Sequence, residues 1–292
     1  IRSKKPLIYL SIPNFVFPNL RLLWLTTFSP ILSYPFHFAI KGIYLCISPY
    51  KFIEFTNSFL YILCMVKKQI KEKYISQIID QWIPKVSERK LAKYIDVFCE
   101  KGYFDINETR LIIKAGKKHG LIPKIHVNQF NSIGGVPLCT ELDCHTIDHL
   151  EILNDEDINA IKKSNTMPVA LPNCSFFLKI PYTPARKIID NNIPLALASD
   201  YNPGSSPSGN MNFVISLACT KMGMTPEEAI NAATINGAFA MGLSEEVGSI
   251  TIGKKANLII TKKISSYSMI PYAFGSNLID EVYINGKAIL GS

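Results

Sequence analysis

The chain has 292 residues, of which 48% are hydrophobic and 18% are charged, with 18 Pro, 16 Gly and a formal net charge of +8. This composition can bury the core of one large domain or two small ones, and it excludes wholesale disorder, collagen and coiled coil. Seven cysteines contain no C-x-x-C pair. That pattern favours free thiols in a reducing, cytoplasmic compartment over a disulfide framework or a zinc ribbon.

The basic charge is concentrated near the amino terminus. Residues 1–65 hold six basic residues and one acidic residue, a net charge of +5, whereas the remaining residues hold 25 basic and 22 acidic, a net charge of +3. A nucleic-acid interface would spread its positive charge over a binding face. We therefore expect no nucleic-acid partner.

Residues 1–65 also differ in composition from the rest, with one Gly, one Ala, one Val and no Asp. Three interpretations stay open: a membrane-associated segment, an out-of-frame stretch, or a genuine unusual domain. Residues 22–40 form a charge-free run that approaches the length of a membrane span, but Pro30 and Pro35 interrupt it. No small-residue cleavage site follows a short apolar core, as a signal peptide requires. Because the chain begins with Ile1, we expect a fragment or a processed product.

Helices and strands are predicted to alternate from residue 71 onward. Apolar residues at helical spacing predict an amphipathic helix over residues 75–86, with Pro84 near its end. Short apolar runs predict five strands at residues 94–99, 124–127, 146–149, 167–171 and 195–199. Helix starts are indicated by Asp105 with Glu108, Asn154 with Asp157, Thr183 before Pro184, and Thr225 with Glu228.

This alternation predicts an α/β fold with a parallel sheet, specifically the C-terminal part of a (β/α)8 TIM barrel. After Gly242, residues 248–253, 256–261 and 280–285 predict small antiparallel strands, with a turn at Asn285-Gly286. We therefore expect three units: an atypical hydrophobic basic segment (1–65), a partial barrel (66–245) and part of a small flanking β-sandwich (246–292).

Three polar residues stand where predicted strands end: His126, His149 and Asp200. Catalytic and ligand-binding residues of parallel barrels lie at these strand ends. Imidazole and carboxylate groups are suitable ligands for a divalent metal such as zinc or iron. An Asp beside a metal-bound water can accept its proton. A histidine packed in the core is the alternative interpretation. The loop at residues 200–207 is rich in Gly, Asn and Ser, which fits either an anion-binding loop with free backbone amides or an ordinary Pro-Gly turn.

Specific strings at these strand ends resemble one enzyme family. Lys124-Ile-His-Val-Asn-Gln129, Asp148-His-Leu-Glu151 and Ala198-Ser-Asp-Tyr-Asn-Pro-Gly-Ser-Ser-Pro207 are similar to the imidazolonepropionases, members of the metal-dependent amidohydrolase superfamily. The resemblance continues through residues 217–220, 225–229, 233–236 and 248–257. It covers residues 71–290, and the string at residues 198–207 is its most specific part.

The resemblance implies hydrolysis of 4-imidazolone-5-propanoate to N-formimidoyl-L-glutamate, a step of histidine degradation, with one zinc or iron ion as cofactor. It implies that His126 and Asp200 are metal ligands and that Gln129 contacts the substrate ring. Asp200 would accept the proton of the attacking water, and His149 would stand beside that water or the developing oxyanion. By the same resemblance, Asn202, Gly204 and Ser205 would hold the propanoate end.

The sequence also departs from the family pattern. The family carries a His-x-His metal pair, and none of the five histidines here forms one. We therefore expect weak metal binding and a poor catalyst. His119, at a helix end, is interpreted as structural, and His145 as a loop residue without an assigned role. The alternative function is a non-catalytic scaffold that docks residues 1–65 on a membrane or a partner; a third interpretation is another cyclic amide or amine as substrate.

The same observations bear on the partners and the solubility of the chain. A membrane partner is not favoured, and a homodimer stays open. A half-barrel leaves sheet edges and an apolar face uncovered, so we expect poor solubility unless residues 1–65 cover that face.

Overall fold

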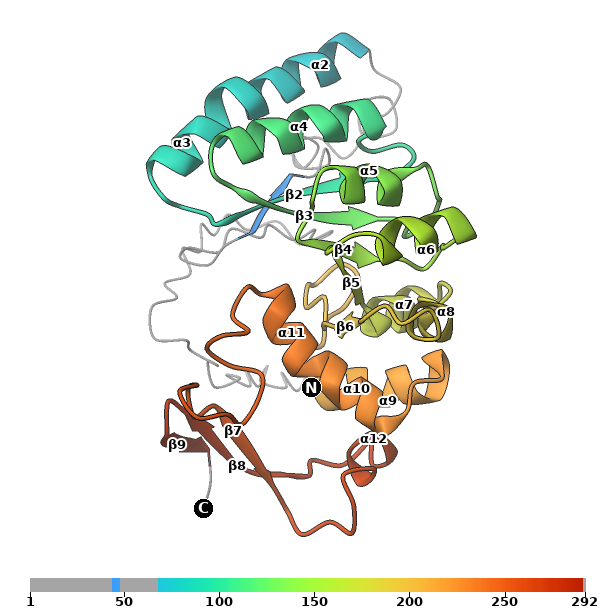
Figure 1. Ribbon diagram of the computed structural model, residues 1–292, viewed down its shortest axis with the longest axis vertical. Helices are drawn as coiled ribbons and strands as arrows, with labels where there is room; N and C mark the ends of the chain where they lie inside the picture. Colours follow the sequence, from blue (N-terminus) through green and yellow to red (C-terminus); the bar gives the residue numbers. More distant parts are fainter. Residues whose placement is uncertain (1–43, 48–67, 291–292) are drawn as a thin grey trace, which may run out of the picture.

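The computed structural model of the protein describes residues 44–47 and 68–290 (Figure 1). Within these residues one parallel sheet holds six strands side by side in chain order. The strands are β1 (Tyr44–Ile47), β2 (Tyr94–Cys99), β3 (Ile122–Val127), β4 (Thr146–His149), β5 (Met167–Ala170) and β6 (Ala196–Leu197). Sequential order with helical crossovers is the arrangement of consecutive βα units in a barrel. The predicted α/β class and parallel sheet are confirmed.

The helices follow the strands and, in Figure 1, α4, α5 and α6 lie together along one side of the sheet. Beyond the helical segment at residues 68–88, the helices are α4 (Ile106–Lys118), α5 (Gly135–Glu141), α6 (Asp155–Lys162), α7 (Pro172–Leu178), α8 (Ala185–Ile189), α9 (Met211–Met222), α10 (Pro226–Ala233), α11 (Ile235–Ala240) and α12 (Met269–Tyr272).

The predicted helix at residues 75–86 is part of a longer helical segment made of α2 (Lys68–Gln77), a π-helical turn η2 (Ile78–Trp82) and α3 (Ile83–Glu88). The Ile83 N–H donates to the Ile78 carbonyl, five residues back, and the following residue, Pro84, has no N–H to donate. Pro84 therefore stands in the first turn of α3, although the sequence placed it near the end of one helix.

Three of the four predicted helix starts are confirmed as capping boxes, at Asp105, Asn154 and Thr225. The prediction at Thr183 is wrong. Helix α8 begins at Ala185, and the Thr183 hydroxyl donates to the His149 carbonyl at 2.6 Å instead of capping the helix. A tertiary contact thus takes the hydroxyl that a cap would have used.

Side chains alternate across the parallel sheet. Ile95, Val97, Ile125, Val127 and Ile147 are wholly buried in the hydrophobic core between sheet and helices. Helix α4 approaches this face so closely that a Cβ on Gly116 would lie 2.7 Å from Ile95 Cδ1. The intervening positions point to the other face, and many of them are polar.

The first strand was not expected. Strand β1 lies within residues 1–65 and pairs in parallel with β2, so the described sheet has one strand more than the five predicted. The strand predicted at residues 195–199 is reduced to Ala196–Leu197. No helix among residues 68–290 is long and apolar enough to cross a membrane.

A second, antiparallel sheet contains β7 (Leu258–Thr261), β8 (Ile279–Ile284) and β9 (Lys287–Leu290) (Figure 1). It confirms the strands predicted at residues 256–261 and 280–285 and the turn between β8 and β9. The strand predicted at residues 248–253 is wrong. That segment contains turns, with Gly248 and Gly253 at positive φ, and the Ile250 and Ile252 side chains are exposed. Its alternating apolar pattern therefore does not correspond to a strand that pairs with another strand of the described chain.

Candidate active site

The polar face of the sheet brings Asp96, His126 and Asp148 together from three neighbouring strands. Asp148 of β4 is the register partner of His126 on β3, and Asp96 on β2 is almost fully buried. The His126 Nδ1 atom lies 2.7 Å from Asp96 Oδ2, and the His126 backbone N–H donates to Asp96 Oδ1 at 3.3 Å. Asp96 therefore holds both the backbone and the ring of His126.

This arrangement sets the charge of His126. Burial lowers the pKa of the imidazole and is the largest single effect, but the charge and hydrogen bond of Asp96 together with the charges of Asp148 and Asp200 outweigh it and raise the pKa of His126 to about 10. The ring is therefore protonated at neutral pH in this arrangement. A metal ion would have to displace that proton in order to bind.

His149 is the last residue of β4 and stands against His126, with ring centroids 5.1 Å apart. Its Nδ1 atom lies 3.3 Å from Glu151 Oε1, which also accepts a hydrogen bond from the Ser175 hydroxyl. His149 has φ +86°, a left-handed conformation that is costly for a residue with a Cβ. The hydrogen bond from Thr183 to the His149 carbonyl holds the backbone in this conformation.

The loop after β6 is organised by Asn202. Its carboxamide Oδ1 accepts hydrogen bonds from the backbone amides of Gly204 at 2.9 Å and Ser205 at 2.7 Å, and its Nδ2 donates to the Asp200 carbonyl. The Ser205 hydroxyl donates to Asp200 Oδ2 at 3.1 Å. The sequence analysis expected free amides here; the structure shows that the amides of Gly204 and Ser205 are occupied by the oxygen of Asn202.

Gln129, just after β3, contacts Cys174 in helix α7. Gln129 Nε2 donates to Cys174 Sγ at 3.4 Å, and both side chains are buried. Burial, followed by the nearby charges of Asp200 and Glu151, raises the pKa of the Cys174 thiol well above its usual value. The thiol is therefore neutral.

Glu100 fixes the loop that carries Gln129. Its side chain is nearly fully buried directly after β2, and its Oε2 accepts hydrogen bonds from the backbone amides of Phe130 at 3.0 Å and Asn131 at 3.3 Å. Its Oε1 accepts the Lys101 amide. The β3–α5 loop is thus tied to a carboxylate of the neighbouring strand.

The sequence analysis missed Asp96, Glu100, Asp148, Glu151 and Cys174 as residues of this site. A signal existed for the first three, because an acid within or directly after a strand predicted to be buried requires a partner. Glu151 and Cys174 offered no such signal, since their partners depend on how separate loops pack.

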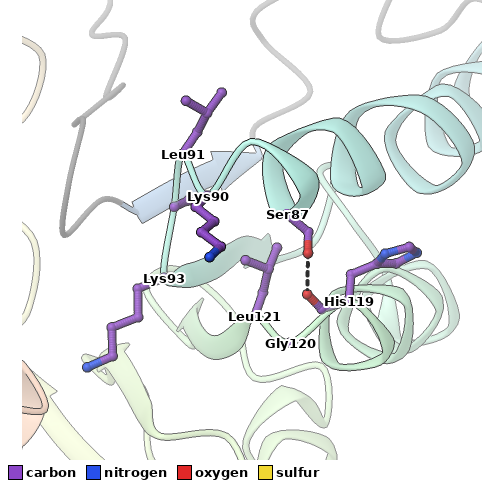
Figure 2. A pocket seen from close by; sticks show the side chains of 8 residues that line it. Ser87, Lys90, Leu91, Lys93, His119, Gly120 and Leu121 are labelled. Carbon is purple, nitrogen blue, oxygen red and sulfur yellow. Dashed lines mark hydrogen bonds between the residues drawn. The ribbon is translucent and has the colours of Figure 1, made fainter.

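The other two described histidines lie before the starts of strands β3 and β4. His119 is the C-cap residue of α4, and its carbonyl accepts the Ser87 hydroxyl at 2.6 Å. Figure 2 shows this contact in a pocket of about 370 Å³ near the starts of β2 and β3, at the end of the sheet opposite His126. His145 Nε2 donates to the Phe239 carbonyl at 2.8 Å, at the start of β4.

The described residues include side chains of the chemical types that bind a divalent metal, but too few of them come together to form a complete set of ligands. His126 and Asp200 interact electrostatically, and the buried oxygens Asp148 Oδ1 and Glu151 Oε2 have no hydrogen-bond donor in the part of the chain described. These two buried carboxylate oxygens could therefore accept a hydrogen bond or contact a positive charge. Yet no three His, Cys, Asp or Glu side chains among the described residues converge as a metal-binding group. The described part of the chain therefore supplies two candidate ligands, His126 and Asp200, and not a complete ligand set.

The fold is part of an α/β barrel, and imidazole and carboxylate groups stand at the carboxyl ends of its parallel strands. This arrangement is typical of barrel hydrolases. A model of the Amidohydrolase family matches residues 90–289, and the chain belongs to this metal-dependent family.

Two curated relatives are named imidazolonepropionase. The protein of Christiangramia forsetii is 64% identical over 222 residues, which cover 76% of this chain and 54% of the relative. That of Flavobacterium johnsoniae is 65% identical over 222 residues with the same coverage. The chain thus spans about half the length of the curated relatives it matches. Among solved structures, an adenosine deaminase from Xanthomonas campestris with bound zinc aligns with a TM-score of 0.57 at 18% identity, over 69% of this chain and 52% of that one, a likeness of fold alone.

Proposed function

We propose that the chain carries the C-terminal part of an imidazolonepropionase, which hydrolyses 4-imidazolone-5-propanoate to N-formimidoyl-L-glutamate in histidine degradation. The observation that carries the proposal is the grouping of His126, His149 and Asp200 at the carboxyl ends of the strands, in a chain 64% identical to a named imidazolonepropionase. We further propose a cytoplasmic location, which the five free cysteines of the described chain support.

The proposed metal ligands are His126 and Asp200, and the proposed metal is one zinc or iron ion. When bound, such an ion lowers the pKa of a water and polarises a carbonyl. Asp200 is proposed to accept the proton of the attacking water, and Ser205 steadies its carboxylate through the 3.1 Å hydrogen bond. His149, held by Glu151, is proposed to stabilise the oxyanion that forms on the ring carbonyl.

The proposed propanoate site is the loop of Asn202, Gly204 and Ser205. The Asn202 carboxamide oxygen occupies two backbone amides that point to one spot, and a substrate carboxylate oxygen would replace it there. A carboxylate makes stronger hydrogen bonds to these amides than a neutral carboxamide, so the exchange is favourable. Gln129 is proposed to contact the ring.

Turnover by the 292-residue chain tests the proposal. Purified chain is incubated with zinc or iron and 4-imidazolone-5-propanoate, and formation of N-formimidoyl-L-glutamate is followed by mass spectrometry. We expect slow turnover, because a first ligand shell reduced to two residues binds metal weakly, and its loss in His126→Ala and Asp200→Ala. His119→Ala, in the pocket of Figure 2, is the matched histidine control and should keep the wild-type rate. Equal product formation by all four chains would refute the proposed site.

The division into units at residues 1–65, 66–245 and 246–292 and the assembly as a homodimer are also proposals. Limited proteolysis that releases a fragment ending near residue 245 would support the division. Light scattering on the purified chain measures the assembly directly.

A further inference from the structure

Thr183 and Thr225 both precede a proline at the start of a helix, yet the structure uses their hydroxyls differently. The Thr225 hydroxyl accepts the Glu228 amide and caps α10. The Thr183 hydroxyl instead donates to the His149 carbonyl at 2.6 Å, and α8 begins without a side-chain cap. We propose that Thr183 is a positioning residue that holds the His149 side chain on the polar face of the sheet, beside His126. This inference rests on the proposed function, in which His149 acts on the reacting carbonyl.

The pleat of β4 does not by itself place His149 near His126. Alternate residues of a strand point to the same face, so His149 should share the face of Ile147. Ile147 is buried in the hydrophobic core between sheet and helices, and so is Val127, the register partner of His149. The His149 ring nevertheless lies against the His126 ring on the polar face, with centroids 5.1 Å apart. The side chain therefore turns from one face of the sheet to the other at the end of the strand.

A strained backbone allows this change of face. His149 has φ +86° and Leu150 has φ +67°, so two consecutive residues with a Cβ are in the left-handed region. This conformation is costly for any residue but glycine, and it persists only where the surrounding structure holds it. Contacts from outside β4 are therefore needed to fix the peptide that joins His149 to Leu150.

That peptide is held at both of its polar groups. The Leu150 N–H donates to the Val127 carbonyl at 3.3 Å, and the His149 carbonyl accepts the Thr183 hydroxyl from the segment before α8. Thr183 is almost fully buried, so water does not readily replace it as a donor. Without the hydroxyl, the His149 carbonyl would lose its buried donor. Rotation of the peptide toward an ordinary strand conformation would then relieve the backbone strain and move the His149 ring.

The contact uses a hydroxyl that would otherwise stabilise α8. A threonine at the N-cap position stabilises a helix by accepting a backbone amide, as Thr225 does in α10. Local rules of this kind are broken mainly at functional or strained sites. The uncapped start of α8 therefore fits a role of Thr183 at His149 and not a role in starting the helix.

Thr183→Val tests the proposal, because valine keeps the branched shape and removes the hydroxyl. Thr225→Val is the matched control, since it makes the same change in the same Thr-Pro pair where the hydroxyl caps a helix. In the full chain with isotope-labelled histidine, the nuclear Overhauser contact between the His126 and His149 rings reports their separation at a fixed pH and needs no ligand. It should be lost in Thr183→Val and kept in Thr225→Val. An unchanged contact in Thr183→Val, or its loss in both variants, would overturn the inference.

Thr183→Ser and Thr183→Ala separate the hydroxyl from the packing of the methyl group, and they serve also if Thr183→Val does not fold. Both variants remove the methyl group, and only serine keeps the donor. The contact between the His126 and His149 rings should be present in Thr183→Ser and absent in Thr183→Ala. Equal behaviour of these two variants would overturn the inference.

Turnover of 4-imidazolone-5-propanoate separates this inference from the proposed function. A displaced His149 no longer faces the reacting carbonyl, so kcat should fall about tenfold or more in Thr183→Val, with KM within about twofold, and return in Thr183→Ser. Thr225→Val should keep the wild-type kcat and lower only the Tm. A purely structural role would lower the Tm in both valine variants and leave kcat unchanged, which would overturn the inference. No turnover by any chain, with the ring contact responding as expected, would instead refute the proposed function and support the hold of Thr183 on His149.

Discussion

Replacement of Glu100 by alanine tests whether a buried carboxylate organises the loop that carries Gln129. In the structure Glu100 accepts two backbone amides of that loop, from Phe130 and Asn131, in addition to its neighbour Lys101. Hydrogen bonds to a charged acceptor contribute about 1.5–3 kcal/mol each, so the two loop bonds are worth about 3–6 kcal/mol together. Because water can reach part of this loop, we expect the lower end, about 3 kcal/mol.

The assay is thermal unfolding at micromolar concentration, combined with hydrogen exchange of the peptide that contains Phe130 and Asn131. A loss of about 3 kcal/mol corresponds to a fall in Tm of about 6–12 °C for a chain of this size. The Phe130 and Asn131 amides should also exchange faster, since their acceptor is gone. Glu245→Ala is the matched control, because this glutamate is exposed and has no hydrogen bond or ion pair among the described residues.

The reasoning would be refuted if Glu100→Ala and Glu245→Ala unfolded at the same temperature as the wild type. It would also be refuted if the Tm fell but exchange at residues 130–131 stayed at the wild-type rate. In that case the carboxylate would stabilise the fold without organising the loop.

Three further predictions concern charge and solubility. Asp96→Asn removes the charge beside His126, so NMR titration should show the pKa of His126 falling from about 10 toward its usual 6.5; an unchanged value contradicts the ion pair. Burial lowers the pKa of His145 below 6.5, so the unfolded chain binds this proton more readily and stability falls as the pH drops through 6.5. Urea unfolding at pH 7.5 and 5.5 should show a smaller loss in His145→Gln, and an equal loss in both chains counts against this account. The described half-barrel leaves strand β6 at a sheet edge, so the chain should aggregate unless residues 1–65 cover the open face; a monomeric sample that melts cooperatively would disprove this.

Local patterns explain why much of the fold could be predicted. The capping boxes at Asp105, Asn154 and Thr225 involve groups three residues apart, so the sequence alone contains both partners. Thr183 follows the same local rule and fails, because its hydroxyl finds the His149 carbonyl 34 residues away. The segment at residues 248–253 fails in a related way, because strand alternation has meaning only beside a partner strand.

In the candidate site, too, some residues could be predicted from the sequence and others could not. His126, His149 and Asp200 could be predicted as candidates from the sequence because each lies near the end of a short apolar strand or follows one, and parallel strands bring their carboxyl ends to one edge. Their partners could not be predicted in this way. The contact from Asp96 to His126 spans 30 residues and that from Gln129 to Cys174 spans 45, and both depend on strand register and loop packing.

The sequence by itself determined five of the six parallel strands in their order, the starts of helices α4, α6 and α10, and the family to which the chain belongs. These properties depend on residues close together in the chain or on strings of specific residues. Only the tertiary structure decided that Asp96 holds His126, that Glu100 accepts the Phe130 and Asn131 amides and that Gln129 donates to the Cys174 thiol. Each of these contacts satisfies a buried polar group with a residue from a different element, and burial makes such pairing obligatory without specifying the partner in advance.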